Sequence, residues 1–414
     1  MRLYIDPGTG SMIFTILVGV IGTAVYLFRD ALVRLRFLLS GGAKVKEETG
    51  DRIPFVIFSD SKRYWNLFEP VCDVFETRGQ PLVYMTASPD DPALEKHYAH
   101  VACTFIGEGN RAFARLNFLK AGVVLSTTPG LDVYQWKRSK DVQWYVHVLH
   151  MASDPTGYRM FGLDYYDAVL LSGEYQIDQI RELERLRGLP AKGLRLTGVP
   201  YLDAMKRRLE TAEPLPPQPV TILLASSWGE SSILRRYGGT AIRAALDTGY
   251  HVIVRPHPQS FVSEREMLEE LMREFPESSR LEWNRDNDNF EVLRRADVLI
   301  SDFSGVIFDY ALVFEKPVIY ADTSFDKAPY DACWLEDEMW TFKVLPRIGK
   351  QLTPDRLDHL REMIDALRSD PGYREAIGQA RRESWAHIGE SAALTADYMI
   401  AKYAELNEAE GTPS

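Results

Sequence analysis

The stretch VLISDFSGVIFDYALVFEKPVIY, Val298–Tyr320, places two apolar runs on either side of a polar segment. The first run, Val298–Ile300, is short and rich in β-branched residues, as in a buried strand. A helix is predicted to begin near Gly305 and to end before Lys316-Pro317, because a proline disfavours helix in the residue that precedes it. Apolar residues after the proline predict a second strand. The stretch therefore indicates a strand–helix–strand unit with parallel strands.

The same alternation of apolar strand and helix recurs along the chain. Candidate strands nearer the amino terminus are Phe55–Ser59, Leu82–Thr86, Gly122–Thr127, Trp144–His150 and Asp167–Gly173. Further on, VTILLASS and HVIVRPHP supply two more strands before the one at Val298. Near-continuous apolar strands separated by helices are typical of parallel sheets covered on both faces. The predicted fold class is therefore α/β, with two doubly wound, Rossmann-like domains.

A proline-rich segment divides the two series of strands. Glu213–Pro219, EPLPPQP, holds four prolines, which neither a helix interior nor a sheet interior accepts. We interpret it as the linker between the domains. The predicted organisation is a membrane anchor with a juxtamembrane linker at 1–48, domains at 49–212 and 220–375, the linker at 213–219, and carboxyl-terminal helices at 376–414.

Composition excludes several classes of protein. A chain of 414 residues with 45% hydrophobic and 26% charged residues is globular and is too long for one core. Its formal net charge of -11 argues against nucleic-acid binding through a basic surface. The cysteines, Cys72, Cys103 and Cys333, are odd in number and widely spaced, which indicates a reducing compartment.

The amino terminus predicts attachment to a membrane. Residues Met12–Phe28 carry no charge, and a run of this length is at the short end for a spanning helix. Basic residues follow it, beginning with Arg29, Arg34 and Arg36, which predicts a single-pass protein of the cell membrane with its main body in the cytoplasm. The alternative for this run is a buried core helix.

Polar segments follow the strands of the second domain, where the carboxyl ends of parallel strands form ligand sites. RPHP places Arg255 and His257 directly after one strand, and LLASSWGESS places Ser226 and Ser227 after another. Arginine can bind phosphate oxygens with a planar fork, and imidazole can donate a hydrogen bond or a proton. A histidine in a loop can also be purely structural. We interpret the loops together as a crevice that binds a diphosphate.

The polar segment within Val298–Tyr320 completes that crevice. Ser304 is a suitable N-cap, and unpaired amides at a helix start favour an anion. A plain capped helix is the alternative. Ser301 and Gly305 flank this position, and Asp302 is expected to fix the loop or to meet a hydroxyl group, since it would repel a phosphate. Asp309, one turn further on, is expected near a ribose or in solvent.

These motifs, in their order and spacing, resemble the CDP-glycerol glycerophosphotransferase family, the teichoic-acid primases and polymerases. The resemblance covers roughly 220–322 and extends back to TGVPYLDAM, residues 197–205. It implies a GT-B fold, two Rossmann-like domains facing across a cleft, and transfer of glycerol phosphate from CDP-glycerol or a related CDP-alcohol to an acceptor hydroxyl, with release of CMP. It also implies that His257, Ser304 and Gly305 hold the diphosphate, assisted by Ser226 and Ser227.

The acceptor side departs from the family pattern. Members carry a Trp-His-Gly-type motif whose histidine is the acceptor's base, whereas this chain has VHVLHMASD. His150 takes the matching place and is the candidate base, with a structural histidine as the alternative. His147 should point to the opposite face of the strand. Tyr201 stands where the family usually has arginine. A membrane-associated acceptor is expected.

The sequence contains no paired-carboxylate motif for a metal. We expect a metal-free site without a cofactor, in which helix amides, arginine and histidine stabilise the charge. Two other functions remain open, since a fold alone does not fix an activity. One is a GT-B transferase that uses a nucleotide-sugar. The other is a non-catalytic, membrane-attached protein that binds a nucleotide or a glycan.

Overall fold

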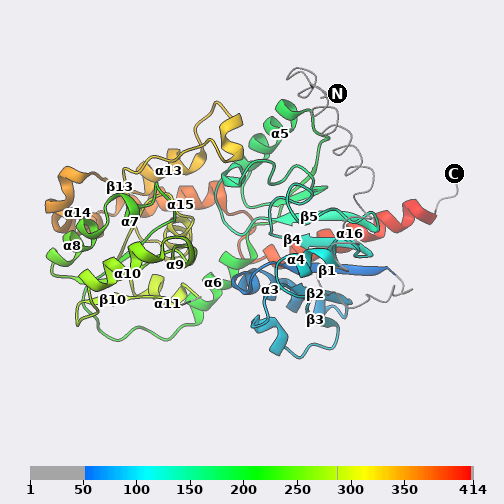
Figure 1. The fold of residues 1–414 in the computed structure, drawn as a ribbon, viewed down its shortest axis with the longest axis horizontal. Helices are drawn as coiled ribbons and strands as arrows, with labels where there is room; N and C mark the ends of the chain where they lie inside the picture. The colour runs from blue at the N-terminus through cyan, green and yellow to red at the C-terminus, as the bar shows by residue number, and fades with distance from the viewer. Residues whose placement is uncertain (1–51, 287, 412–414) are drawn as a thin grey trace, which may run out of the picture.

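The structure, a computed structural model, describes residues 52–286 and 288–411. Two lobes lie side by side, and each is built around one parallel sheet (Figure 1). The first lobe holds the strands of the amino-terminal half, and the second lobe holds those that follow residue 220. The carboxyl-terminal helix, red in Figure 1, returns to the first lobe.

The first lobe contains a seven-stranded sheet in the order β3-β2-β1-β4-β5-β6-β7. Its strands are β1 Ile53–Ser59, β2 Leu82–Thr86, β3 Val101–Phe105, β4 Ala121–Ser126, β5 Val142–Val148, β6 Ala168–Leu171 and β7 Gly193–Leu196. All neighbouring strands are parallel. The main helices of this lobe are α3 Trp65–Thr77, α4 Asn110–Leu116, α5 Tyr175–Arg187 and α6 Pro200–Thr211. The strand order reverses between β1 and β4, so a ligand site is expected at their carboxyl ends.

The second lobe contains a six-stranded parallel sheet in the order β10-β9-β8-β11-β12-β13. Its strands are β8 Thr221–Ala225, β9 His251–Arg255, β10 Leu281–Trp283, β11 Val298–Ser301, β12 Val318–Ala321 and β13 Gly349–Leu352. The order reverses between β8 and β11. Its helices are α7 Ile233–Arg236, α8 Gly239–Asp247, α9 Ser260–Ser263, α10 Arg265–Glu274, α11 Phe290–Arg295, α12 Val306–Phe308, α13 Trp340–Ile348, α14 Leu360–Ser369 and α15 Gly372–Ser384. A π-helical turn, η4 Asp309–Val313, continues α12.

Two parallel sheets with helical connections confirm the α/β fold class that the sequence predicts. Edge strands β3, β10 and β13 were missed. β10 has only three residues, and β13 reads GKQL, which lacks an apolar run. The predicted membrane helix, 12–28, lies outside the described residues. Within the described part of the chain, no helix has the length and apolar character needed to cross a membrane.

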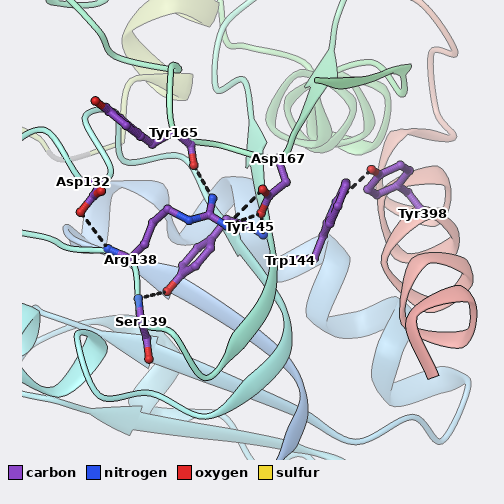
Figure 2. Close-up of polar contacts among 8 residues, drawn as sticks. All are labelled: Asp132, Arg138, Ser139, Trp144, Tyr145, Tyr165, Asp167 and Tyr398. Atoms are coloured by element: carbon purple, nitrogen blue, oxygen red, sulfur yellow. Dashed lines mark hydrogen bonds and ion pairs between the residues drawn. The ribbon is translucent and has the colours of Figure 1, made fainter. Parts of the chain in front are cut away.

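The last helix, α16 Ser391–Gly411, packs on the first lobe beside α3 and β4. The indole N–H of Trp144, on β5, donates to the Tyr398 hydroxyl of α16 over 3.3 Å, as Figure 2 shows. The Tyr403 ring lies so near Gly122, on β4, that a Cβ there would come within 2.4 Å of it. The carboxyl-terminal segment therefore completes the first lobe.

The loop between β4 and β5 is tied to the same sheet. Arg138 donates to both carboxylate oxygens of Asp167, over 3.1 and 2.9 Å, and its guanidinium lies 4.7 Å from the centre of the Tyr145 ring (Figure 2). The Tyr145 hydroxyl in turn accepts from the Ser139 amide over 2.9 Å. A charge-assisted, partly buried pair of this kind fixes the path of the loop.

Asp203, on α6 of the first lobe, binds the segment of the chain that runs from α15 of the second lobe to α16. Its buried carboxylate accepts from the Trp385 indole N–H over 3.0 Å and from the Ser391 amide over 2.9 Å. The Asp of TGVPYLDAM is thus a structural acceptor at the start of α16.

We expect Asp203→Ala to lower the free energy of unfolding by about 2–4 kcal/mol, because it leaves two buried donors without an acceptor. Urea-induced unfolding measures this change. Asp178→Ala, on the exposed surface of α5, is the matched control and should shift stability by less than about 0.5 kcal/mol. Equal stability of the two variants would contradict the role given to Asp203.

Candidate functional site

A cavity of about 460 Å³ lies between the two sheets. Its walls come from the residues that follow β1 and β5 in the first lobe and β8, β9 and β11 in the second. The points at which the two strand orders reverse therefore face one another. A cavity of this size, lined by both polar and aromatic side chains, is typical of a small-molecule site.

Most of the predicted site residues line this cavity. Those present are His150, His257, Arg255, Ser226, Ser304, Gly305 and Asp309. Ser227, Ser301 and Asp302 do not line it, and all three are buried. The Ser226 hydroxyl is also buried, at the cavity wall, and has no hydrogen-bond partner among the described residues. A ligand oxygen would supply that partner.

Asp302, which was predicted to bind substrate, does not line the cavity, and its carboxylate is occupied by backbone amides. It accepts from the amides of Ser227, Ile233, Phe303 and Ser304 over 2.8–3.1 Å. Burial raises the pKa of this carboxyl, and the amide hydrogen bonds oppose that rise. Asp302 thus fixes the loops after β8 and β11, one of the two roles that the sequence allows for it. Ser227 contributes its amide to the same network.

The predicted side-chain cap at Ser304 is also absent. Gly305 occupies the N-cap position, and only the Ser304 carbonyl takes part, by accepting from the Ile307 amide over 3.1 Å. In the described part of the chain, the Ser304 hydroxyl and the amides of Gly305 and Val306 have no hydrogen-bond partner. Gly305 has an ordinary helical φ of -56, so its backbone does not require glycine. The free hydroxyl and amides are donors for an anion.

His257 is held as a hydrogen-bond donor. Its Nδ1 accepts from the Gln259 amide over 3.0 Å. Burial, with smaller contributions from the charges of Arg63 and Arg255, lowers the pKa of His257 to about 4. The ring is therefore neutral near pH 7, and its one N–H is on Nε2. A neutral imidazole with this tautomer can donate to a phosphate oxygen.

His150 has the opposite tautomer. The Thr127 hydroxyl has one proton, which it donates to the Val148 carbonyl over 2.8 Å. Its oxygen lies 2.8 Å from His150 Nδ1, so it accepts from that nitrogen, and Nδ1 carries the ring proton. Burial, followed by the Arg63 charge, lowers the pKa of His150 to about 3. His150 is therefore neutral, with a lone pair on Nε2 that can take a proton.

His147 and His150 do not point to opposite faces of a strand, as was expected. β5 ends at Val148, and the chain bends at His150. Both rings approach one hydroxyl, that of Tyr158, with His147 Nε2 at 3.1 Å and His150 Nδ1 at 3.3 Å. His147 is completely buried and does not line the cavity, so its role is structural.

Asp309 lies at the cavity wall and is not solvated. Its carboxylate contacts the Asn289 amide over 3.3 Å and the Tyr201 hydroxyl over 3.4 Å. The Tyr201 hydroxyl also donates to Asn289 over 2.8 Å. Burial raises the pKa of Asp309 to about 7, with both neighbours opposing the rise. Asp309 begins the π-helical turn η4, and turns of this kind are frequent at functional sites.

Several cavity residues were not predicted. The turn after β1 contributes Arg63 and Tyr64, the start of α3 contributes Asn66, and the loop after β8 contributes Trp228. The signal for the first group was present, since SDSKRY follows the apolar strand FVIFS. It is the same pattern of polar residues after a strand that identified the loops of the second lobe. Met151 contacts the start of α12: its sulfur would lie 3.6 Å from a Cβ on Gly305.

The side chains offer no preformed metal site. Among residues 52–286 and 288–411, no three His, Cys, Asp or Glu side chains lie close enough together to hold a metal ion. The polar groups at the cavity are amides, hydroxyls, imidazoles, guanidinium groups and the carboxylates of Asp288 and Asp309.

The family model of CDP-glycerol:poly(glycerophosphate) glycerophosphotransferases matches residues 164–333. This part of the chain is similar to the CDP-glycerol glycerophosphotransferases. The match confirms the resemblance found in the motifs and the enzyme class it implies, a glycerophosphotransferase-like transferase. It contains the cavity residues of the second lobe, whereas His150 and Arg63 precede it. No curated protein matches the chain.

Several solved structures share the fold of this chain at low sequence identity. The wall teichoic acid polymerase TagF superposes with a TM-score of 0.59 at 14% identity, over 92% of this chain and 99% of that one. A histidine-to-asparagine variant of TagF soaked with CDPG superposes with a TM-score of 0.57 at 14% identity, over 93% of this chain and 99% of that one. The UDP-GlcNAc 2-epimerase of Methanocaldococcus jannaschii superposes with a TM-score of 0.54 at 11% identity, over 85% of this chain and 100% of that one. These likenesses establish a GT-B-like architecture.

The pKa of His150 makes stability depend on pH. An unfolded histidine has a pKa of about 6.5, so below that pH the unfolded chain binds a proton that the folded chain does not. The free energy of unfolding therefore decreases as the pH falls from about 6.5 toward the folded pKa of about 3. Above about 6.5 this residue contributes no pH dependence.

When the pH is lowered from about 7 to about 5, the free energy of unfolding should decrease less in His150→Asn than in the wild type. The difference between the two decreases should be on the order of 1–2 kcal/mol. Urea midpoints at the two pH values measure the difference. His359→Asn, at an exposed position in the same chain, should leave the wild-type pH dependence unchanged. Parallel curves for wild type and His150→Asn would show that His150 titrates normally.

Proposed function

We propose that this glycerophosphotransferase relative moves glycerol phosphate, or a similar polyol phosphate, from a CDP-alcohol to an acceptor hydroxyl. The acceptor oxygen forms a bond to the β-phosphorus of the donor. The bond from that phosphorus to the bridging oxygen breaks, and CMP leaves with the bridging oxygen. One observation carries the proposal: His150 and His257 line one cavity with opposite tautomers.

His150 is proposed as the base. Its Nε2 lone pair can accept the proton that the acceptor hydroxyl loses, because Nδ1 already donates to Thr127. A base with a pKa of about 3 is weak before the reaction. The phosphate charge that arrives with the donor would raise that pKa, since a nearby opposite charge favours the protonated ring. His150 then becomes a stronger base only when the donor is bound.

The second lobe is proposed to hold the diphosphate. His257 Nε2–H, the Ser304 hydroxyl and the free amides of Gly305 and Val306 are donors at the start of α12, and Arg255 adds a positive charge. Donors that are fixed before the reaction stabilise the charge that develops on the departing phosphate. Asp309, with a pKa of about 7, is proposed to meet a ribose or glycerol hydroxyl. TagF soaked with CDPG supports the choice of donor.

A nucleotide-sugar is the alternative donor. The epimerase whose fold this chain shares was solved with UDP-GlcNAc and UDP. Thermal shift with CDP-glycerol and UDP-GlcNAc separates the two possibilities: a rise in melting temperature with the uridine compound alone would overturn the CDP-alcohol proposal.

The two histidine variants should separate chemistry from binding. His150→Ala is expected to lower turnover about a hundredfold or more while nucleotide affinity stays nearly the same, which is the usual scale for a lost general base. His257→Ala should weaken both nucleotide affinity and turnover. CMP release and calorimetric titration of CMP measure the two quantities. Wild-type turnover in His150→Ala would remove His150 from the mechanism.

We also propose that the uncharged run Met12–Phe28 anchors the protein in the cell membrane, with the described lobes in the cytoplasm near a membrane-associated acceptor. The support is the length of the run and the basic residues after it. Deletion of residues 1–45 is expected to move the protein from the membrane fraction to the supernatant. If the truncated and full-length proteins are found in the same fraction, residues 1–45 do not anchor the protein in the membrane.

A further inference from the structure

Arg63 is a cavity residue to which neither the motifs nor the family match assigns a role. It lies on the short 3-10 turn Lys62–Tyr64, directly after β1, in the first lobe. We propose that Arg63 binds the phosphate that is transferred, and that the acceptor-side lobe in this way supplies its own positive charge to the reaction. This inference rests on the proposed function and adds a residue to it.

The guanidinium of Arg63 is held beside the proposed base. It lies 4.8 Å from the centre of the Tyr64 ring, a cation–π contact. The Tyr64 ring in turn lies 5.0 Å from the His150 ring. Arg63 and His150 therefore both contact the Tyr64 ring, and all three side chains line the cavity. An oxygen that gives its proton to His150 would be bound within reach of this charge.

The charge of Arg63 acts on both walls of the cavity. After burial, it is the next cause that lowers the pKa of His150, in the first lobe, and of His257, in the second. These histidines follow β5 and β9. Arg63 lines the same cavity as these two histidines, and the phosphate to be transferred must lie in that cavity if both histidines act on it.

Arg63 is available for a ligand. Among the described residues, its guanidinium makes no ion pair, and the side chain is exposed. Asp60 is close enough for the Arg63 charge to lower its pKa, but burial raises that pKa by more. Lys62, the preceding residue, is paired with Asp90 and does not line the cavity. The turn thus presents one cation to a carboxylate and the other to the cavity.

A cation at this place would stabilise the charge of the transferred group. In phosphoryl transfer the charge spreads over the oxygens of the transferred group, between the attacking and the leaving oxygen. The donors of the second lobe, Arg255 and the start of α12, lie on the side of the leaving nucleotide. On the attacking side the proposed base is a neutral imidazole. Arg63 supplies the positive charge there, with a planar fork that matches two phosphate oxygens.

The first test is the binding of inorganic diphosphate by the full chain, measured by titration calorimetry. Arg63→Gln is expected to weaken binding about tenfold or more, as for a lost hydrogen bond to a charged group. The diphosphate affinity of Arg63→Lys should lie between those of the wild type and Arg63→Gln, because lysine keeps the charge but lacks the planar guanidinium. Lys62→Gln is the matched control, since it removes the neighbouring charge, and it should bind within about twofold of wild type.

The second test compares CMP, which lacks the transferred phosphate. Arg63→Gln should bind CMP as the wild type does and should lower the rate of CMP release from CDP-glycerol about a hundredfold or more. Wild-type diphosphate affinity in Arg63→Gln, an equal loss of CMP and diphosphate binding, or no diphosphate binding by the wild type would each overturn the proposal. Specific loss of diphosphate binding without any CMP release by the wild type would support Arg63 and refute the transferase.

Discussion

The site depends on the buried carboxylate of Asp302. Four backbone amides from two loops converge on it, from the segment after β8 and from the segment before α12. A buried anion is costly unless hydrogen bonds satisfy it, and here the amides do so. Because their directions are set by one carboxylate, the loops have little freedom. The Ser226 hydroxyl and the Gly305 amide thereby lie at the cavity without hydrogen-bond partners in the described part of the chain.

The cavity also needs its two walls at a fixed separation, and three buried aspartates provide this. Asp154, in the first lobe, accepts from the amides of Trp340 and Thr341 at the start of α13. Asp331, from the second half of the chain, accepts from the Phe161 amide over 2.7 Å and pairs with buried Arg187. Asp203 completes the set at α16. Each carboxylate binds donors from a distant segment, so the lobes are joined by directional contacts as well as by a continuous apolar core.

The sequence predicts those parts of the molecule that local pattern determines. Apolar strands such as Leu82–Thr86 and the strand–helix–strand unit at Val298–Tyr320 lie where the pattern places them. Polar residues after the strands of the second lobe correctly identify most of its cavity wall. The sequence allows two roles for Asp302, because a carboxylate that binds a ligand and one that binds buried amides can have the same sequence context at a strand end. Edge strands such as β13, Gly349–Leu352, carry too few apolar residues to be recognised.

The two histidines show why residue type alone does not assign a chemical role. His150 and His257 are both neutral imidazoles at strand ends, both partly buried, and both with a lowered pKa. They differ because Thr127 has already given its proton to a carbonyl, whereas the Gln259 amide has a proton to give. The first contact places the ring proton on Nδ1, and the second places it on Nε2. The ability to accept or to donate at the cavity is thus set by one backbone or hydroxyl group behind each ring, and for His150 that group is 23 residues away in the sequence.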